Sequence, residues 1–243
     1  MPNGIKDYYN LVQMPWGKMF YDIAYKQLNI SNDTRLKILD FGSGFGVTAN
    51  YYAKNHNVIA IEPNQEMINM SFNENTYTLI KGDVKILKQF DDEFDVVICH
   101  NVLEYAPNQK EIFSQLVRVL KPKGKLSIIK HNTLGRAMAA AVFDDNPQAA
   151  LDLISDNINK EKSSTFGNRN LYTNDQIIAW TNENDIKLSQ VLGIRAFFGI
   201  TKNNNIKFGE KWYDKMLELE MLASCMDEFK AIAFFNHLIF EKK

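Results

Sequence analysis

A short apolar run that ends in an acid and then passes through three glycines reads Leu36-Lys37-Ile38-Leu39-Asp40-Phe41-Gly42-Ser43-Gly44-Phe45-Gly46. Residues 47–53 continue with a helical pattern, so we predict a strand, a tight turn and the start of a helix. Glycine at positions 42 and 44 lets the backbone bend sharply and approach a ligand with no Cβ in between. A strand, a glycine turn and a helix N-terminus are typical of a cradle for a nucleotide-like cofactor.

A second acid stands at the end of the next predicted strand. Residues 58–61 read as a buried strand, and Glu62 follows them about twenty residues after the glycine turn. A carboxylate at this position can accept hydrogen bonds from both hydroxyls of a ribose. We therefore interpret Glu62 as a candidate cofactor ligand.

Polar residues also follow the third and fourth predicted strands, at residues 77–81 and 94–99. The third strand ends in Gly82-Asp83-Val84, and the fourth runs into His100. Because the carboxyl ends of parallel strands meet at one edge of a sheet, we expect Glu62, Asp83 and His100 to converge beside the glycine turn.

The rest of the chain is predicted from periodicity and capping signals. Thr173 is the expected N-cap of a helix, with Gln176 completing a capping box. The other predicted elements are helices at 16–28, 109–120, 134–143, 147–158 and 208–223, a turn at 121–124, a loop at 160–170, and strands at 125–130, 186–195 and 230–240.

The order of these features resembles the class I S-adenosylmethionine-dependent methyltransferases. That family has an acid before G-x-G, an acid ending the second strand, Asp after the third strand, and a Pro-Gly turn before the fifth. The likeness runs from residue 36 to residue 130 without a large gap. It implies an α/β fold: a Rossmann-like, doubly wound, mostly parallel seven-stranded sheet with an antiparallel edge strand and a helical lid inserted after strand 5. It also implies S-adenosyl-L-methionine as cofactor.

A nucleotide-dependent dehydrogenase is the main alternative, because both families use an acid at the end of the second strand. The dinucleotide fingerprint G-x-G-x-x-G requires a third glycine where this chain has Val47, and Gly46 gives the tighter G-x-G-x-G instead. The Gly82-Asp83-Val84 turn also favours the methyltransferase. A protein that binds S-adenosylmethionine without catalysis is a further alternative that the cradle alone does not exclude.

Length and composition indicate one domain over residues 1–243, and the resemblance implies that it is a methyltransferase domain. Its expected parts are a leading helical segment at 1–30, a cofactor-binding core at 31–131, a helical lid at 132–172, and a C-terminal part at 173–243 that completes the sheet. The two cysteines, Cys99 and Cys225, read as small core residues with no metal-binding spacing. We expect a reduced, cytoplasmic location, no metal, and no membrane contact, since no apolar stretch approaches the ~18–20 residues that span a bilayer.

Motifs in the second half resemble a narrower group, the bacterial methyltransferases that esterify 5-carboxymethoxyuridine at the wobble position of tRNA. These motifs are residues 100–105, 126–132, 193–197 and 217–220. The resemblance implies tRNA as the partner that carries the methyl acceptor. Two features depart from the family pattern: Lys18 stands near the position of an expected arginine, and the lysine-rich run of the lid is reduced to residues 159–162. The net charge of −1 does not by itself indicate a nucleic-acid partner.

The resemblance also implies roles for individual residues. Gly42 and Ser43 would contact the methionine end of the cofactor, with Gly44 completing the turn. Glu62 would take the ribose, and Asp83 and Val84 the adenine. The remaining cofactor candidates are Asp40, which orients the glycine turn and meets the amino group through water, and His100, which lies between cofactor and acceptor.

Few titratable residues are available for catalysis. His100, Glu104 and Tyr105 are the polar candidates just past the fourth predicted strand, and His100 is the candidate catalytic residue among them. A carboxylate acceptor is ionised at neutral pH and needs no general base. Arg195 is the candidate for binding an acceptor anion, with a surface ion pair as the alternative. His131 and Tyr105 are further substrate candidates, and His237 reads as a satisfied buried histidine. A carboxylate or hydroxyl of a small metabolite is the alternative acceptor.

Overall fold

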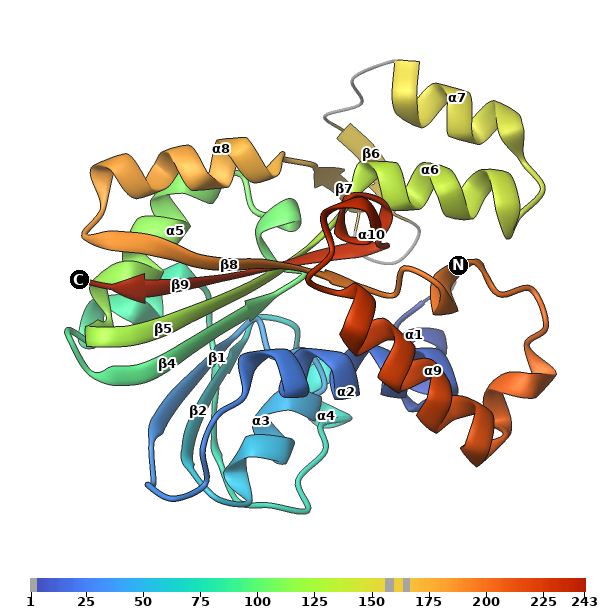
Figure 1. Cartoon of the computed structure of the whole chain (residues 1–243). Coiled ribbons are helices and arrows are strands. Elements are labelled where there is room, and N and C mark those ends of the chain that lie inside the picture. The colour runs from blue at the N-terminus through green and yellow to red at the C-terminus, as the bar shows by residue number, and fades with distance from the viewer. Residues whose placement is uncertain (1–3, 156–159, 164–166) are drawn as a thin grey trace. The chain divides into compact units, whose positions relative to one another are not determined.

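A computed structural model describes residues 4–155, 160–163 and 167–243, without the side chains of 160–163, 167 and 168 (Figure 1). The helices are α1 Ile5–Gln13, α2 Pro15–Leu28, α3 Val47–Ala53, α4 Gln65–Asn69, α5 Gln109–Arg118, α6 Thr133–Val142, α7 Pro147–Ser155, α8 Asn174–Ala179, α9 Glu210–Ala223 and α10 Asp227–Ile232. The strands are β1 Lys37–Phe41, β2 Asn57–Glu62, β3 Thr78–Lys81, β4 Phe94–His100, β5 Leu120–His131, β6 Lys160–Ser163, β7 Gly167–Asn170, β8 Ile186–Ile194 and β9 Phe235–Lys242.

Seven strands form one sheet in the order β3-β2-β1-β4-β5-β9-β8. The pairs β1–β2, β1–β4 and β2–β3 are parallel, with Asp40 opposite Ala60 and Glu62 opposite Lys81. The last strand, β9, lies between β5 and β8. The β8–β9 edge is antiparallel, since Lys243 beyond the end of β9 donates to Asp185 before the start of β8. The predicted fold class, a mostly parallel seven-stranded sheet with an antiparallel edge, is therefore confirmed.

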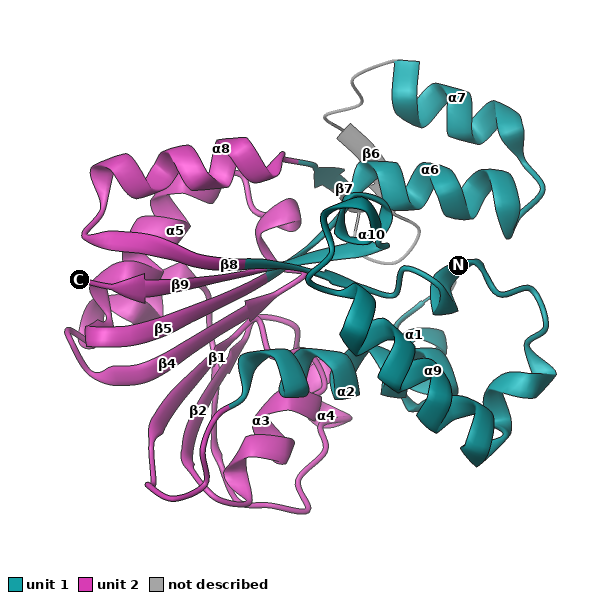
Figure 2. Ribbon diagram, in the orientation of Figure 1, with its two compact units in different colours: residues 1–29, 129–171, 191–237 teal, residues 30–128, 172–190, 238–243 magenta. Residues whose placement is uncertain are grey.

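The chain divides into two compact units (Figure 2). Unit 2 comprises residues 30–128, 172–190 and 238–243, and it contains β1 to β4 complete. Figure 2 shows α3 and α4 on one side of these strands and α5 and α8 on the other. Buried aliphatic residues of β1, β2 and β4 fill the layer between these helices, because strands covered on both faces are apolar throughout. On α5, Phe113 packs edge-on against Trp180 and Phe240.

Unit 1 comprises residues 1–29, 129–171 and 191–237. Helix α2 carries Met19, Phe20, Ile23 and Ala24 at helical spacing, and these residues pack with Phe198, Tyr213 and Phe235 in one buried cluster. The predicted leading helix is thereby confirmed as α2. Helices α6 and α7 follow β5, as predicted, and contact each other through small residues around Ala137, Ala140 and Ala150.

Three predicted boundaries are wrong. The turn predicted at 121–124 is part of β5, where Lys123 adopts a left-handed φ of 63° and Lys121 pairs with Asp95. The strand predicted from Lys230 begins only at Phe235, because residues 227–232 form α10. The loop predicted at 160–170 contains the antiparallel hairpin β6–β7. That hairpin consists of polar residues and glycine, so no apolar alternation indicated it.

Four smaller predictions concern single residues and one helix end. The Thr173–Gln176 capping box is confirmed. His237 is fully buried, and its Nδ1 lies 2.8 Å from Gln27 Oε1, so the prediction of a satisfied buried histidine is confirmed. Cys99 is buried as predicted, but Cys225 is exposed, because it follows the end of α9 rather than lying in its buried face. The predicted extension of α7 to residue 158 falls on residues 156–159, outside the described structure.

Candidate functional site

The glycine turn between β1 and α3 requires glycine for conformational and steric reasons. Gly42, Gly44 and Gly46 all have positive φ, at 75°, 57° and 70°. A Cβ on Gly42 would lie 2.4 Å from a methyl group of Val102, and one on Gly46 would lie 2.2 Å from the Tyr77 hydroxyl. The predicted tight turn is therefore confirmed: all three positions have a backbone conformation that favours glycine, and positions 42 and 46 also lack room for a side chain.

Glu62 holds this turn in place. Its carboxylate accepts hydrogen bonds from the backbone N–H of Gly44 at 2.8 Å and of Asn64 at 2.8 Å. The side chain is buried, and burial raises the pKa of Glu62, while the two backbone N–H groups oppose that rise. The predicted convergence of Glu62 on the glycine turn is thus present in unit 2. A carboxylate offers about four lone-pair sites, so Glu62 retains capacity for further donors.

Asp83 follows β3 at the same edge of the sheet. The backbone N–H of Gly82 donates to the Glu62 carbonyl at 3.2 Å, which places the turn after β3 directly beside the end of β2. The Asp83 side chain is exposed and accepts from the N–H of Lys85 at 2.9 Å, capping the short 3-10 helix Val84–Gln89. A capping role and a ligand role are compatible, since one carboxylate oxygen is used by the cap.

Asp40, at the end of β1, is the most perturbed acid of this edge. Burial raises the pKa of Asp40 to about 7; the backbone N–H of Ala49 lowers it and the neighbouring Glu62 charge raises it further. Its Oδ2 is buried and has no hydrogen-bond partner among the described residues. The same holds for Ser43 Oγ and Asn101 Oδ1. Buried oxygens are normally paired, so these three fit a ligand that brings hydrogen-bond donors and positive charge to the glycine turn.

The end of β4 carries the remaining candidates of unit 2. His100 is half-buried, and its Nε2 lies 2.8 Å from the hydroxyl of Ser127 on β5. Asn101 then takes a left-handed φ of 54°, which redirects the chain into the short 3-10 helix Leu103–Tyr105. Tyr105 is half-buried, whereas Glu104 is 1% exposed.

Arg195 lies at the end of β8 in unit 1 and has a left-handed φ of 65°. Its guanidinium carbon lies 5.2 Å from the ring centre of Phe234 and 5.6 Å from that of Phe198. Burial lowers the pKa of Arg195 to about 10, and Glu220 partly opposes this shift. Arg195 forms no ion pair with any residue that the structure describes, so the alternative of a surface ion pair is not found.

His131, also in unit 1, is engaged within its own unit. Its Nε2 lies 3.0 Å from Arg169 Nη1, and its ring lies 4.9 Å from that of Phe235. The neighbouring Asn132 donates to the carbonyls of Ala231 and Ala233, which anchors the start of α6. These contacts give His131 a fixed orientation, and its role toward a substrate stays a prediction.

The structure therefore brings together Asp40, Glu62, the glycine turn, the start of the turn after β3, and His100 within unit 2. Arg195 and His131 belong to unit 1. Sequence reasoning gave no role to Asn101 or Lys207, and it noted Glu220 only as part of a motif. The positive φ of Asn101 and the burial of Lys207 leave no signature in a single sequence. Glu220 could have been noticed, because it is an acid at a buried position of the amphipathic helix α9.

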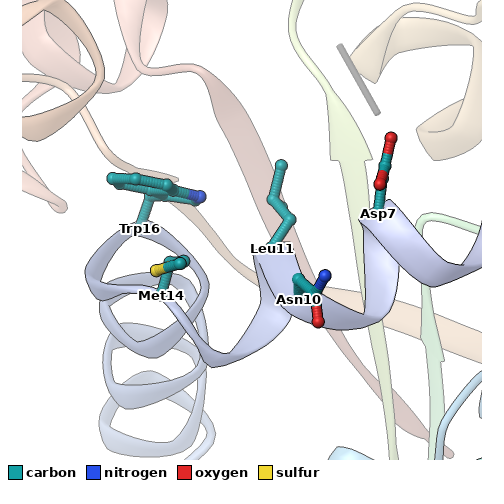
Figure 3. A pocket seen from close by; sticks show the side chains of 5 residues that line it. All are labelled: Asp7, Asn10, Leu11, Met14 and Trp16. Atoms are coloured by element: carbon teal, nitrogen blue, oxygen red, sulfur yellow. The ribbon is translucent and has the colours of Figure 1, made fainter. Parts of the chain in front are cut away.

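A separate surface depression of about 250 Å³ lies on the N-terminal helices (Figure 3). Figure 3 shows the side chains that line it, from α1, the residue that links the helices, and α2: Asp7, Asn10, Leu11, Met14 and Trp16. It is mostly apolar and carries no cluster of catalytic groups.

Among residues 4–155, 160–163 and 167–243, no group of three His, Cys, Asp or Glu side chains is arranged to hold a metal ion. Within the same residues, none of the helices has the length and apolar character to cross a bilayer.

The chain is similar to known methyltransferases. Residues 39–128 match a family model described as a methyltransferase domain. The tRNA 5-carboxymethoxyuridine methyltransferase of Escherichia coli strain K12 is 22% identical over 217 residues, which cover 86% of this chain and 80% of that protein. A ubiquinone biosynthesis O-methyltransferase of Rickettsia bellii is 32% identical over 129 residues, which cover 51% of this chain and 52% of that protein.

Solved structures share the fold at low sequence identity. An S-adenosylmethionine-dependent methyltransferase from Mesorhizobium loti superposes with a TM-score of 0.56 at 14% identity, covering 90% of this chain and 98% of that one. A magnesium protoporphyrin IX methyltransferase from Synechocystis, solved with bound SAH, gives a TM-score of 0.57 at 13% identity, covering 94% and 83%. The dehydrogenase alternative finds no support in these matches.

Proposed function

Since the chain is a class I S-adenosylmethionine-dependent methyltransferase, we propose that its methyl acceptor is a carboxylate, that of 5-carboxymethoxyuridine in tRNA. The enzyme class and the cofactor are established by the family match. The acceptor and the roles of individual residues are the proposal.

The unit 2 cradle suits the cofactor. When bound, S-adenosylmethionine supplies an activated methyl group on a sulfonium. The free buried oxygens of Asp40 and Ser43 would face its charged methionine end, and Glu62 would accept from its ribose. The turn at Asp83 and Val84 would border its adenine. Asp40 Oδ2 and Ser43 Oγ have no hydrogen-bond partner among the described residues, and Glu62 has lone pairs beyond the two that accept backbone N–H groups.

The residues of this chain would then position the acceptor for methyl transfer and would not need to transfer a proton. A carboxylate is already ionised at neutral pH, so methyl transfer needs no general base. In-line orientation and exclusion of water supply the acceleration. His100 is held by Ser127 at 2.8 Å, which suits a fixed wall of the site.

The observation that carries the proposed acceptor is the extent of the likeness to the Escherichia coli tRNA enzyme. That likeness covers 86% of this chain, and therefore includes residues well beyond the family match at 39–128. The parts of a methyltransferase outside its cofactor core are the ones that distinguish acceptors.

A small-molecule acceptor is the second candidate, supported by the higher identity to the ubiquinone biosynthesis enzymes. That match, at 32% identity, extends over 51% of this chain. The balanced net charge of −1 also favours a small acceptor over a polyanion.

The acceptor is tested by incubating the full chain with methyl-labelled S-adenosylmethionine and tRNA from cells in which its gene is deleted. We expect label in tRNA as an alkali-labile ester, because a methyl ester hydrolyses in base and a methyl ether does not. tRNA from wild-type cells is the matched control and should accept little. Label in the small-metabolite fraction with none in tRNA would contradict the proposal.

The raised pKa of Asp40 leads to a pH-dependent cofactor affinity. Below its pKa of about 7, Asp40 is protonated in the free enzyme, and above it the carboxylate is charged. A positively charged ligand favours the charged form. Hence we expect the Kd for S-adenosylmethionine, measured by calorimetry, to fall as pH rises from about 6 to about 8.

Asp40→Asn is the matched variant for this test, because its side chain has the same shape and does not ionise. In Asp40→Asn, the part of the fall in Kd that is due to Asp40 should be absent. Any pH dependence that remains in the variant then comes from other groups, such as the amino group of the cofactor. The variant should also gain stability relative to the wild type at pH 8 and not at pH 4, because a raised folded-state pKa destabilises the free enzyme as pH rises toward it. Parallel pH profiles for both proteins would show that Asp40 does not face the cofactor charge.

A further inference from the structure

Two cationic side chains of unit 1 contact the same aromatic ring. The guanidinium carbon of Arg195 lies 5.6 Å from the ring centre of Phe198, and the ammonium nitrogen of Lys207 lies 4.7 Å from it. Lys207 is contributed by the short 3-10 helix Asn205–Phe208, and it also contacts the ring of Phe143 at 5.2 Å. The two charges therefore occupy one aromatic-lined region, although 12 positions separate them in the sequence.

Lys207 is buried and Arg195 is half-buried, and neither forms an ion pair with an acid that the structure describes. Lys207 is 4% exposed, and within the described structure its ammonium donates one hydrogen bond, to Asn204 Oδ1 at 3.0 Å. The Nε of Arg195 is buried and has no hydrogen-bond partner among the described residues. Neither side chain forms an ion pair with any of those residues.

The acid nearest to Arg195 is already committed elsewhere. Glu220 accepts the backbone N–H groups of Ala196, Phe197 and Phe198 at 2.8, 2.9 and 2.7 Å. Its carboxylate thus fixes the loop that directly follows Arg195. Within the described structure Glu220 forms no ion pair with Arg195 or Lys207.

The two positive charges repel each other. Burial, together with the nearby Arg195 charge, lowers the pKa of Lys207 to about 8. A buried charge without a paired counter-charge is costly, and strongly perturbed groups cluster at functional sites.

We propose that Arg195 and Lys207 together bind the carboxylate of the methyl acceptor. This assignment rests on the proposed function, since it names the group that the acceptor presents. The planar guanidinium, with a free Nε–H beside its terminal N–H groups, matches a planar carboxylate, and the lysine adds a point charge. The aromatic wall favours a carboxylate over a phosphate, which holds its water more strongly.

The same pair explains how product would leave. In the transfer, a carboxylate oxygen forms the O–CH3 bond, the S–CH3 bond breaks, and its electron pair goes to sulfur. The acceptor changes from a carboxylate of charge −1 to a neutral ester. Two cations that bind the substrate anion therefore lose their attraction for the product.

The test uses the full chain and the Nε–H resonance of Arg195, which Arg195→Lys assigns by its disappearance. Sodium acetate is the carboxylate probe, methyl acetate the neutral product-like probe, and sodium phosphate the competing anion. We expect acetate to shift the resonance saturably and methyl acetate to leave it unmoved. In Lys207→Met, which keeps an apolar stem, the acetate Kd should rise about tenfold.

Two variants control for indirect effects. Lys202→Met removes an exposed lysine of the same unit, which pairs with Asp145, and should leave the acetate Kd unchanged. Lys207→Arg should restore acetate binding if the charge is what matters. If Lys207→Met does not fold, the acetate-dependent shift of the Arg195 Nε–H resonance in the wild type and in Lys207→Arg still tests the site.

The outcomes separate this inference from the acceptor proposal. A Lys207-dependent acetate shift supports the anion site even when tRNA accepts no label, in which case only the acceptor is wrong. No shift with acetate overturns the site, whatever tRNA does. A stronger response to phosphate than to acetate would also overturn it, because the pair would then serve a phosphate group.

Discussion

Glu62→Gln is expected to weaken S-adenosylmethionine binding by about 2–3 kcal/mol, or roughly 30–150-fold in Kd. The physical reason is that both oxygens of Glu62 are in use. One accepts the N–H of Gly44 and the other that of Asn64. An amide presents only one oxygen, so its NH2 group would face one of these backbone donors and disturb the glycine turn. The lost charge would also weaken the proposed bonds to the ribose.

Calorimetry on the full-length variant measures this effect. Glu66→Gln is the matched control, because Glu66 is an exposed acid four residues further on, in the first turn of α4. It should bind the cofactor as the wild type does. An unchanged Kd in Glu62→Gln would mean that Glu62 neither shapes the turn for the cofactor nor contacts it.

Glu220→Ala is expected to lower the free energy of unfolding by about 3–5 kcal/mol. The substitution leaves three backbone N–H groups, those of residues 196–198, without the acceptor that they share. The site is buried, since Glu220 is 2% exposed, so water does not easily replace the carboxylate. Urea unfolding followed by circular dichroism measures the change.

Glu220→Gln should lose less, because one amide oxygen can still accept from part of the loop. Glu218→Gln is the control on the same helix: Glu218 is exposed and pairs with Lys215, and its replacement should leave the unfolding midpoint unchanged. A loss below about 1 kcal/mol in Glu220→Ala would contradict the role assigned to this carboxylate.

The elements of the cofactor cradle were predictable because their signals are local. A strand that ends in Asp40 and three glycines has a strong pattern, and its positive φ angles follow from the need for glycine. Parallel pairing then brings the ends of neighbouring strands to one edge, which placed Glu62 beside the turn without any knowledge of tertiary contacts.

The features that escaped prediction depend on contacts between distant segments. Lys207 reads as an ordinary surface lysine in a polar loop, and only folding buries it against Phe143 and Phe198. The role of Glu220 arises because three amides, 22–24 positions earlier in the chain, meet it in unit 1. The hairpin β6–β7 is held by backbone pairing between polar residues, so its sequence resembles that of a loop.

The segments that make up the two units have a consequence for anyone who wishes to dissect this enzyme. The chain passes between the units five times, at residues 29/30, 128/129, 171/172, 190/191 and 237/238. Three strands, β5, β8 and β9, contain one of these passages each. No single cleavage can therefore release either unit intact, and a chimaera that exchanges one unit with a relative must replace three separate segments at once.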